Sequence, residues 1–243
     1  MNIDIEGLKE IERTKNKSNG FSDSLLLSSF ISTIDNIIAI GNKMSKSEMA
    51  MFINSFQYWI LNRSKKKSTK RCLPGTILEV ELGFAYKPET PYRHSALVIK
   101  EYKDKVLIVP STSNKTFVKS AYHPIDNPSG NKSYRKVGKS DGFDHDCVLA
   151  LDDFKTISKN RIISTCGSID VDSDDCLYKE IRRTLLYTIF NEETSEFEQR
   201  IENLNDEIAK KQEEIHKQKE KVSSLFGKIH QKNLYIQKLT KKK

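Results

Sequence analysis

From Ile201 to Ile236, a β-branched residue stands at every seventh position. The members of this repeat are Ile201, Ile208, Ile215, Val222, Ile229 and Ile236. Such a repeat is typical of position a of a coiled coil, and it restricts this part of the chain to one long helix. The d positions are half polar, with Leu204, Leu225 and Leu239 beside Lys211, Gln218 and Lys232. The β-branched a positions favour a parallel two-stranded coiled coil, while the half-polar seam leaves packing within the chain open.

The N-terminal part of the sequence also follows a helical period. Apolar residues recur at helical spacing from Leu25 to Ile40, and a Gly-Asn pair at 41–42 interrupts them. Ser45 and Glu48 then form the pattern of a capping box, which opens a second helix. Residues 1–62 are therefore expected to form a helical hairpin. Residues 63–71 carry six positive charges in nine residues and are expected to be an exposed basic linker.

Composition and cysteine spacing limit the possible classes of protein. The apolar segment 24–40 contains five Ser or Thr residues together with Asp35 and Asn36, so no membrane-spanning helix is expected. The N-terminal residues lack a signal-peptide pattern, which predicts a cytoplasmic protein with reduced thiols. The four cysteines form no CxxC pair and have no histidine at zinc-ligand spacing. Neither a metal site nor a cofactor is therefore expected.

The net charge is +8, yet it says little about the middle of the chain. Residues 72–170 hold 14 Lys and Arg against 12 Asp and Glu, and the basic excess lies mainly on the flanks. The overall charge is therefore weak evidence for nucleic-acid binding by this region.

The middle region changes to short runs rich in β-branched residues. These runs are Thr76–Leu82, Ala96–Ile99, Val106–Val109, Cys147–Leu151 and Arg161–Thr165, with Pro, Gly, Asn and Asp clusters between them. The separations are too short for helical crossovers between parallel strands, so a small, mostly antiparallel β-barrel or sandwich is expected over residues 72–175. The predicted fold class is α+β, with this region between the helical hairpin and a long coiled-coil helix over residues 176–243.

Three segments of the middle region carry recognisable motifs. Residues 82–99 are LGFAYKPETPYRHSALVI, residues 106–113 are VLIVPSTS, and residues 153–162 are DFKTISKNRI. In order and spacing they resemble the PemK/MazF family of toxin endoribonucleases. In that family a strand ends in glycine, a loop carries a glutamate, an Arg-Pro or His-Pro pair opens the next strand, and a third strand ends in Thr-Ser. The resemblance covers residues 72–170 and implies an SH3-like barrel, a homodimer and a cognate antitoxin.

The resemblance also implies a reaction. Members of the family cleave single-stranded RNA without a metal, and they release a 2',3'-cyclic phosphate and a 5'-hydroxyl. The internal 2'-hydroxyl is the nucleophile in such a cleavage. The protein must therefore take its proton, protonate the leaving oxygen and stabilise the developing charge.

Carried over by position, the resemblance gives Thr112 the hydroxyl role and places the family's arginine at His94, one residue after Arg93. Supporting positions are Glu89, Ser111 and Ser113. Because neighbouring residues of a strand point to opposite faces, His94 and Arg93 cannot both face the site in a regular strand. Either His94 is the general base, or a local bulge turns Arg93 toward the phosphate. A slow or inactive nuclease is a third alternative.

Two groups of residues are candidates for RNA binding. The first consists of Lys132, Tyr134, Arg135 and Lys136, and the second of Lys159 and Arg161. An aromatic ring among cations suits base stacking beside phosphate neutralisation. A structural role is the alternative for each group, as a hairpin loop for the first and as local hydrogen bonds for the second.

The sequence thus predicts a metal-independent endoribonuclease of a toxin-antitoxin system. The alternative is a weak or inactive module of the same fold that binds RNA or DNA and assembles through its coiled coil. A third hypothesis makes the heptad helix the working part of an assembly component.

Overall fold

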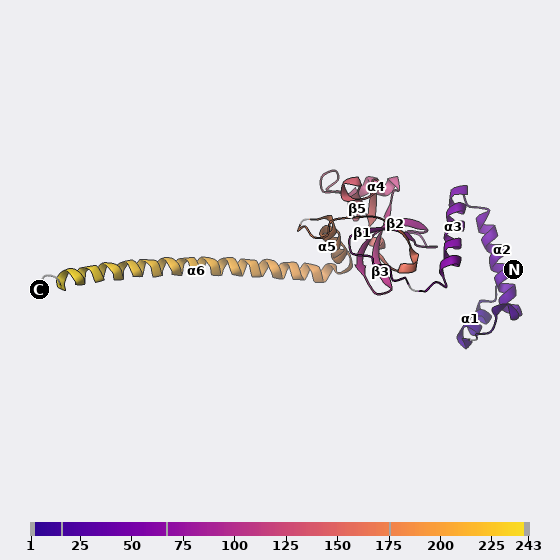
Figure 1. Cartoon of the computed structure of the whole chain (residues 1–243), viewed down its shortest axis with the longest axis horizontal. Coiled ribbons are helices and arrows are strands. Elements are labelled where there is room, and N and C mark those ends of the chain that lie inside the picture. Colours follow the sequence, from indigo (N-terminus) through magenta and orange to yellow (C-terminus); the bar gives the residue numbers. More distant parts are fainter. Residues whose placement is uncertain (1–2, 16, 67, 175, 241–243) are drawn as a thin grey trace. The chain divides into compact units, whose positions relative to one another are not determined.

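The computed structural model describes residues 3–15, 17–66, 68–174 and 176–240 (Figure 1). The chain divides into two compact units, residues 1–181 and 182–243. In the described residues, the first unit contains N-terminal helices followed by an eight-stranded sheet, and the second contains the end of helix α5 and helix α6. The expected α+β class is therefore confirmed. A long C-terminal helix is also present, but it begins at Asn191 and not at residue 176, because the separate helix α5 (Leu177–Ile189) precedes it.

The N-terminal helices are α1 (Ile5–Thr14), α2 (Ser24–Gly41) and α3 (Lys46–Asn62), with a 3-10 turn at Gly20–Ser22 before α2. Each helix begins at a side chain that accepts a hydrogen bond from the free backbone N–H groups of the first turn. The capping residues are Asp4, Asp23 and Ser45. Ser45 accepts a hydrogen bond from the N–H of Glu48, at the position that the capping-box pattern indicates.

Helix α2 is the most apolar helix of the N-terminal part. It has 18 residues with a mean hydropathy of 1.5, and 17% of it is buried. By length and composition alone, α2 could cross a membrane, which the sequence analysis did not expect. Core helices of soluble proteins and N-terminal signal sequences have the same composition.

The sheet contains eight strands. They are β1 (Thr76–Glu81), β2 (Arg93–Glu101), β3 (Lys105–Thr112), β4 (Ala121–Tyr122), β5 (Asn131–Val137), β6 (Cys147–Ala150), β7 (Lys155–Ser158) and β8 (Ile162–Ser168). Their order is β4-β5-β6-β3-β2-β1-β8, and β7 pairs with β3 beside this path. All pairs are antiparallel except β4–β5. In the described residues the terminal strands β4 and β8 do not pair, so the sheet is open and the closed SH3-like barrel is not confirmed.

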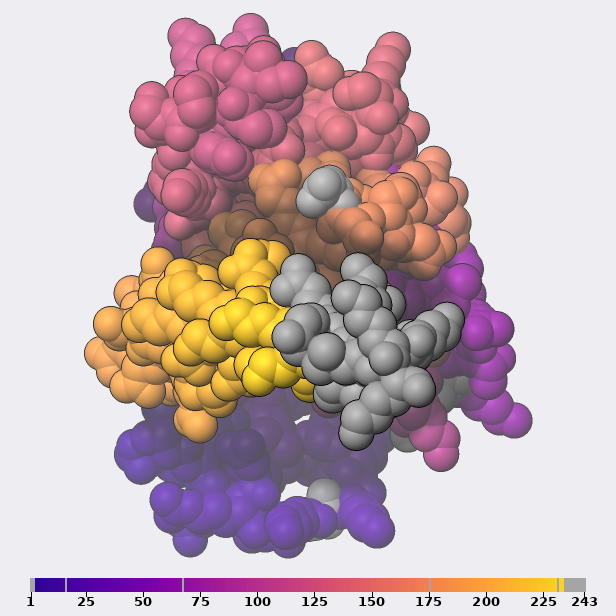
Figure 2. All heavy atoms as spheres, turned by 90° about the vertical axis from the view of Figure 1, so that its left-hand side faces the viewer, coloured from indigo at the N-terminus to yellow at the C-terminus, as the bar shows by residue number. Residues whose placement is uncertain are grey.

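The core lies along β1, β2 and β3, and one cluster of it is formed by side chains on one face of these strands. It contains Leu78, Val80, Ala96, Val98, Val106 and Ile108. Ile77, Leu97 and Val109, on the other face of the same strands, are also buried, so a slip of one residue would exchange the side chains packed on the two faces. Short helices complete the first unit, with α4 (Lys115–Ser120) after β3 and α5 (Leu177–Ile189) after β8. Figures 1 and 2 both show α4 beside β5.

Helix α3 packs on the outer face of β1 through a buried carboxylate. Glu81 Oε1 accepts hydrogen bonds from Ser55 Oγ at 2.7 Å and from the Gly83 N–H at 2.8 Å. Tyr58 Oη donates to the Ile162 carbonyl at 3.2 Å, and burial raises the pKa of this phenol. Gly83 has φ of +82°, and a Cβ there would meet the Arg161 guanidinium at 3.1 Å.

A buried ion pair joins β2 to the turn before β8. Lys159 Nζ lies 2.6 Å from Glu101 Oε1, and its side chain is 5% exposed. Glu101 Oε1 also accepts a hydrogen bond from the Cys72 N–H at 2.9 Å. The hydrogen bond from Lys159, followed by that from Cys72, lowers the pKa of Glu101.

We expect the substitution Lys159→Met to lower the free energy of unfolding by about 2 kcal/mol, because Glu101 loses a charged hydrogen-bond partner. Urea denaturation followed by circular dichroism would measure the loss. The matched control is Lys105→Met on the exposed side of β3, for which we expect a change within about 0.5 kcal/mol. Folding lowers the pKa of Glu101, so the stabilisation that its carboxylate provides is lost as the pH falls through the pKa of the folded state. The difference between wild type and Lys159→Met should therefore shrink in acid, and equal stability at neutral pH would contradict the pair's role.

Candidate functional site

A cavity of about 360 Å³ lies where the β1–β2 loop meets the ends of β3 and β6. Its lining residues are Pro88, Glu89, Thr90, Pro91, His94, Thr112, Asn114, Phe117, Tyr134, Ala150, Asp152 and Asp153. Four of them, at positions 89, 94, 112 and 134, were singled out from the sequence. The structure therefore brings together residues from two of the motifs and from the predicted RNA-binding loop.

Strand pairing places His94 beside Thr112. His94 pairs with Val80 of β1, and on the other side Ala96 pairs with Pro110 of β3. The β2–β3 pairing ends there, and beyond it His94 Nδ1 lies 2.8 Å from the carbonyl oxygen of Ser111, the residue before Thr112. The two side chains thus reach the same cavity because the core fixes the pairing of their strands.

The hydrogen bond of His94 fixes the tautomer of its neutral ring. Nδ1 lies 2.8 Å from the carbonyl oxygen of Ser111. A carbonyl only accepts hydrogen bonds, so Nδ1 carries the proton and Nε2 carries the lone pair. A histidine held in this way can take a proton at Nε2, as a general base must.

Thr112 ends β3, and Asn114 begins the short helix α4 behind it. Thr112 Oγ1 accepts a hydrogen bond from the Asn114 N–H at 3.3 Å, which leaves the hydroxyl proton available to a ligand. Asn114 Oδ1 accepts from the Thr116 N–H at 3.0 Å as the helix cap, so its amide nitrogen is the group left to donate. Both side chains can therefore donate hydrogen bonds to a bound anion.

Tyr134 forms the opposite wall of the cavity. Its ring centroid lies 4.8 Å from that of Phe117. Burial, followed by the negative charge of Asp152, raises the pKa of the Tyr134 phenol, so it keeps its proton at neutral pH. Tyr134 can therefore serve as a proton donor.

The cavity wall is acidic. Asp153 Oδ2 accepts a hydrogen bond from the Thr90 N–H at 2.8 Å and so holds the β1–β2 loop, while Asp153 Oδ1 pairs with Lys155 at 2.9 Å. Glu89 and Asp152 add two further carboxylates, and the lining contains no Lys or Arg among the described residues. The described residues also contain no cluster of three or more His, Cys, Asp or Glu side chains that could hold a metal ion.

Arg93 points away from this cavity. It pairs with Glu81 in a regular β1–β2 ladder, which continues without a bulge to Ile77 and Leu97. Arg93 Nε lies 2.6 Å from Glu79 Oε1 on the other face, and this hydrogen bond lowers the pKa of Glu79. The bulge that would have turned Arg93 toward the cavity does not occur in this ladder.

The serines that flank Thr112 lie outside the cavity as well. Ser111 is buried, its hydroxyl is hydrogen-bonded to Ser95, and its carbonyl orients His94. Ser113 is exposed, and its hydroxyl lies 3.0 Å from His145 Nε2.

The predicted RNA-binding cations are mostly engaged elsewhere. Arg135 is 7% exposed and forms two bonds to the Glu180 carboxylate, at 2.7 and 3.1 Å. Lys136 lies 3.2 Å from Asp126, and Lys159 forms the buried pair with Glu101. Lys132 is exposed at the start of β5. Tyr134 and Arg135 separate because neighbouring residues of β5 face opposite sides.

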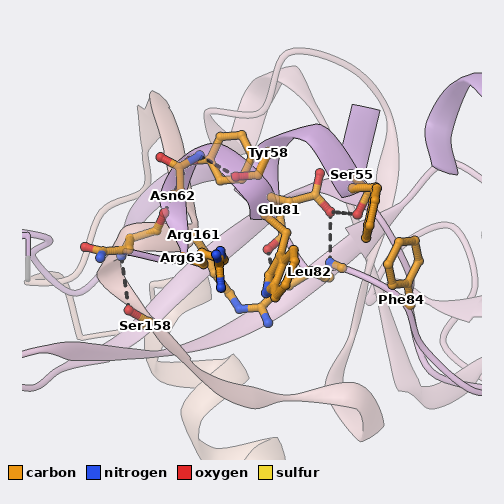
Figure 3. Close-up of a pocket in the computed structure, with 13 residues that line it drawn as sticks. Ser55, Tyr58, Asn62, Arg63, Glu81, Leu82, Phe84, Ser158 and Arg161 are labelled. Atoms are coloured by element: carbon orange, nitrogen blue, oxygen red, sulfur yellow. Dashed lines mark hydrogen bonds between the residues drawn. The ribbon is translucent and has the colours of Figure 1, made fainter. Parts of the chain in front are cut away.

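Arg161 lines a second, larger cavity of about 560 Å³ between α3 and the sheet (Figure 3). Its Nη1 donates to the carbonyl oxygen of Glu81 at 3.0 Å. Figure 3 shows Arg63 of the α3 end near Arg161, and the Arg63 guanidinium lies 5.4 Å from the Trp59 ring centroid. Arg161 therefore belongs to the packing of α3 and not to the His94 cavity.

Sequence reasoning assigned no role to the other eight residues of the cavity, among them Asn114, Phe117, Asp152 and Asp153. Asn114 could have been recognised as a helix cap, because it stands directly after a strand and before Lys115–Ser120. The two aspartates directly follow a fully buried strand, where side chains of neighbouring strand ends meet. Phe117 has no sequence signal of its own.

Comparison with known proteins gives similarity to solved structures alone. No family model matches the sequence, and no curated protein matches it. An endoribonuclease in complex with its cognate antitoxin, from a mycobacterial species, aligns at 14% identity and a TM-score of 0.34, over 50% of this chain and 97% of that one. The Mycobacterium tuberculosis toxin MazF-mt6 aligns at 12% identity and a TM-score of 0.33, over 48% of this chain and 96% of that one. Likeness at these scores determines no function, so the residues of the cavity must carry any proposal.

We expect the neutral His94 ring to carry its proton on Nδ1, because the Ser111 carbonyl accepts from that atom. A long-range proton–nitrogen correlation spectrum of nitrogen-labelled protein would identify the tautomer, with His94→Gln to assign the signals. The exposed His230 offers a comparison with no fixed partner among the described residues. An Nε2–H tautomer at His94 would show that the hydrogen bond is absent.

Proposed function

We propose that the chain is a metal-independent endoribonuclease of the PemK/MazF type that cleaves single-stranded RNA. The observation that carries the proposal is the meeting of His94, Thr112 and Tyr134 in one cavity, with the tautomer of His94 fixed. These residues offer a proton acceptor, a hydroxyl donor and a proton donor, which are the groups that cleavage by a 2'-hydroxyl needs.

In the proposed reaction, His94 Nε2 takes the proton of the 2'-hydroxyl, and the oxygen attacks the adjacent phosphorus. The bond from phosphorus to the 5'-oxygen breaks, and Tyr134 gives its proton to that oxygen. The products are a 2',3'-cyclic phosphate and a 5'-hydroxyl. Thr112 and the Asn114 amide donate hydrogen bonds to the phosphoryl oxygens, and the His94 imidazolium adds a positive charge beside them.

The proposal extends to the properties that the family resemblance implies. The sheet would correspond to the SH3-like barrel of the family, and the protein would act in the cytoplasm as a homodimer. A cognate antitoxin would cover the cavity that holds His94. Exposed Lys132 would contact the RNA backbone next to Tyr134.

A second candidate is a module of the same fold that binds RNA or DNA without cleaving it. Two observations favour it: Arg93 is paired with Glu79 on the other face, and three carboxylates line the cavity. Carboxylates repel the phosphate backbone and leave His94 as the cationic group at the site. Catalysis at such a site would be slow.

We expect the full-length protein to cleave a long single-stranded RNA in the presence of EDTA. His94→Ala should lower the cleavage rate by about 10²- to 10⁴-fold, because the general base is lost. Arg93→Ala should leave the rate within about threefold, because the Arg93 side chain faces away from the cavity. Gel analysis with end-group identification of the cyclic phosphate would measure both.

The matched control for this experiment is His145→Ala, since His145 is an exposed histidine outside the cavity. Circular dichroism of each variant would show that the fold is retained. Full activity of His94→Ala, or a large loss with Arg93→Ala alone, would refute the site. Retention of uncleaved RNA by the wild type would favour the binding module instead.

A sulfur substitution in the substrate tests the role of Tyr134. Tyr134→Phe should slow cleavage of ordinary RNA by about 10²-fold, because the leaving oxygen lacks its proton donor. An RNA with sulfur in place of the 5'-bridging oxygen has a leaving group that departs without protonation. With that substrate Tyr134→Phe should cleave at nearly the wild-type rate, while His94→Ala should remain slow. An unchanged defect of Tyr134→Phe on the sulfur substrate would exclude its role as the acid.

A further inference from the structure

Helix α6 (Asn191–Thr240) is one continuous helix of 50 residues with an uncovered apolar stripe. At 1.5 Å per residue it is about 75 Å long. The a and d residues Ile201, Leu204, Ile208, Ile215, Val222, Leu225 and Ile229 are 50 to 58% exposed. The side chains of Ile236 and Leu239 lie outside the described ones. Most helical stability in proteins comes from the packing of such a stripe, so it requires a partner.

We propose that α6 pairs with α6 of a second copy of this chain in an antiparallel two-stranded coiled coil centred near residue 220. The β-branched a positions favour a parallel pair. The polar d positions and the flanking charges favour the opposite orientation. In Figure 2, α6 is seen nearly end-on with its side chains around it.

The first argument concerns the polar residues of the seam. In a parallel pair each d residue faces its own copy, so Lys211 would meet Lys211 of the partner subunit, and Gln218 would meet Gln218 of the partner subunit. In an antiparallel pair each d residue faces an a residue. With the centre near 220, Lys211 faces Ile229 of the partner subunit and Gln218 faces Val222 of the partner subunit. The antiparallel pair therefore brings no two lysines together in the centre of the seam.

Lys211 forms an ion pair within its own helix. Its Nζ reaches Glu207 on the preceding turn at 3.0 Å. The charged end therefore leaves the seam, while the methylene stem remains available to cover an isoleucine. This conformation suits a position opposite the Ile229 side chain of the partner subunit.

The second argument concerns the g positions, where charge changes sign along the helix. Glu207 and Glu214 stand before the centre, and Lys221 and Lys228 stand after it. In an antiparallel pair g positions face g positions, so Glu207 meets Lys228 of the partner subunit and Glu214 meets Lys221 of the partner subunit. By symmetry this gives four attractive contacts in the dimer. Charges at these positions set orientation in coiled coils.

A parallel pair gains less from the same charges. There, each g residue faces an e residue five positions further on. The described e positions from 205 to 226 are Asn205, Gln212, Lys219 and Phe226. Only Glu214 finds an opposite charge among them, at Lys219 of the partner subunit, which gives two contacts per dimer. Each exposed pair contributes about 0.2 to 1 kcal/mol, so the difference favours the antiparallel orientation.

Disulfide crosslinking of the full-length chain tests the orientation. The exposed Cys166 is first replaced by serine, and the other three cysteines are buried. Two chains, Lys211→Cys and Ile229→Cys, are oxidised separately and as a mixture. The antiparallel pair predicts a disulfide dimer in the mixture alone, because each cysteine is about 27 Å from its own copy in that register. Dimers of each variant alone would show a parallel pair. Absence of a dimer in all three samples would show that α6 does not pair with itself, as expected for packing on another protein.

Charge exchange provides an independent test in the same cysteine chains. Glu207→Lys with Glu214→Lys in both chains should reduce the crosslinked fraction several-fold, because lysines then face lysines. The crosslinked fraction should recover when one chain carries Glu207→Lys with Glu214→Lys and the other carries Lys221→Glu with Lys228→Glu. The matched control, Glu213→Lys with Glu220→Lys, makes the same charge change at positions outside the seam and should have no effect. Failure of the mixed chains to recover would contradict the antiparallel register.

Discussion

The antiparallel register of β1, β2 and β3 is the constraint on which the candidate site depends. Val80, Val98 and Ile108 are inaccessible to solvent, and a slip of one residue would exchange them with the different set of side chains buried on the other face. The same register turns His94 toward the cavity and Arg93 toward Glu79 on the other face. The choice between a histidine and an arginine at the site is therefore made by core packing. The reaction that the site performs plays no part in this choice between His94 and Arg93.

The electrostatics of the cavity set the character of the proposed catalyst. Two of the cations predicted to bind RNA serve the fold, because Lys159 pairs with Glu101 and Arg135 with Glu180. The cavity keeps carboxylates, and burial, followed by the charge of Asp152, raises the pKa of Tyr134. A site of this kind favours proton transfer over tight binding of phosphate. Binding of a polyanion would then depend on exposed cations outside the cavity.

Periodicity predicted the elements of this fold better than it predicted their partners. The capping residue Ser45, the strands of the core and the heptad helix all follow from local patterns. The closed barrel was not confirmed, because closure depends on pairing between β4 and β8, and strand edges leave no local signal. The roles of Arg135 and Lys159 could not be predicted from local sequence either, because the carboxylates to which they bind lie 45 and 58 residues away along the chain. One signal in the sequence was not used. Neighbouring residues of a strand point to opposite faces, and this alternation separates Tyr134 from Arg135 on β5.

Helix α6 shows how a single pattern can support two assemblies. Its a positions are equally apolar in both orientations, so their burial alone does not choose a direction, although their β-branching favours the parallel one. The choice falls to residues that contribute little stability, namely Lys211 at d and the four charged g positions. The free energy of burying the apolar stripe is nearly the same in the two orientations and cancels from their difference. The small electrostatic contributions therefore decide the orientation. With its centre near residue 220, an antiparallel pair also holds the N-terminal ends of the two helices about 87 Å apart.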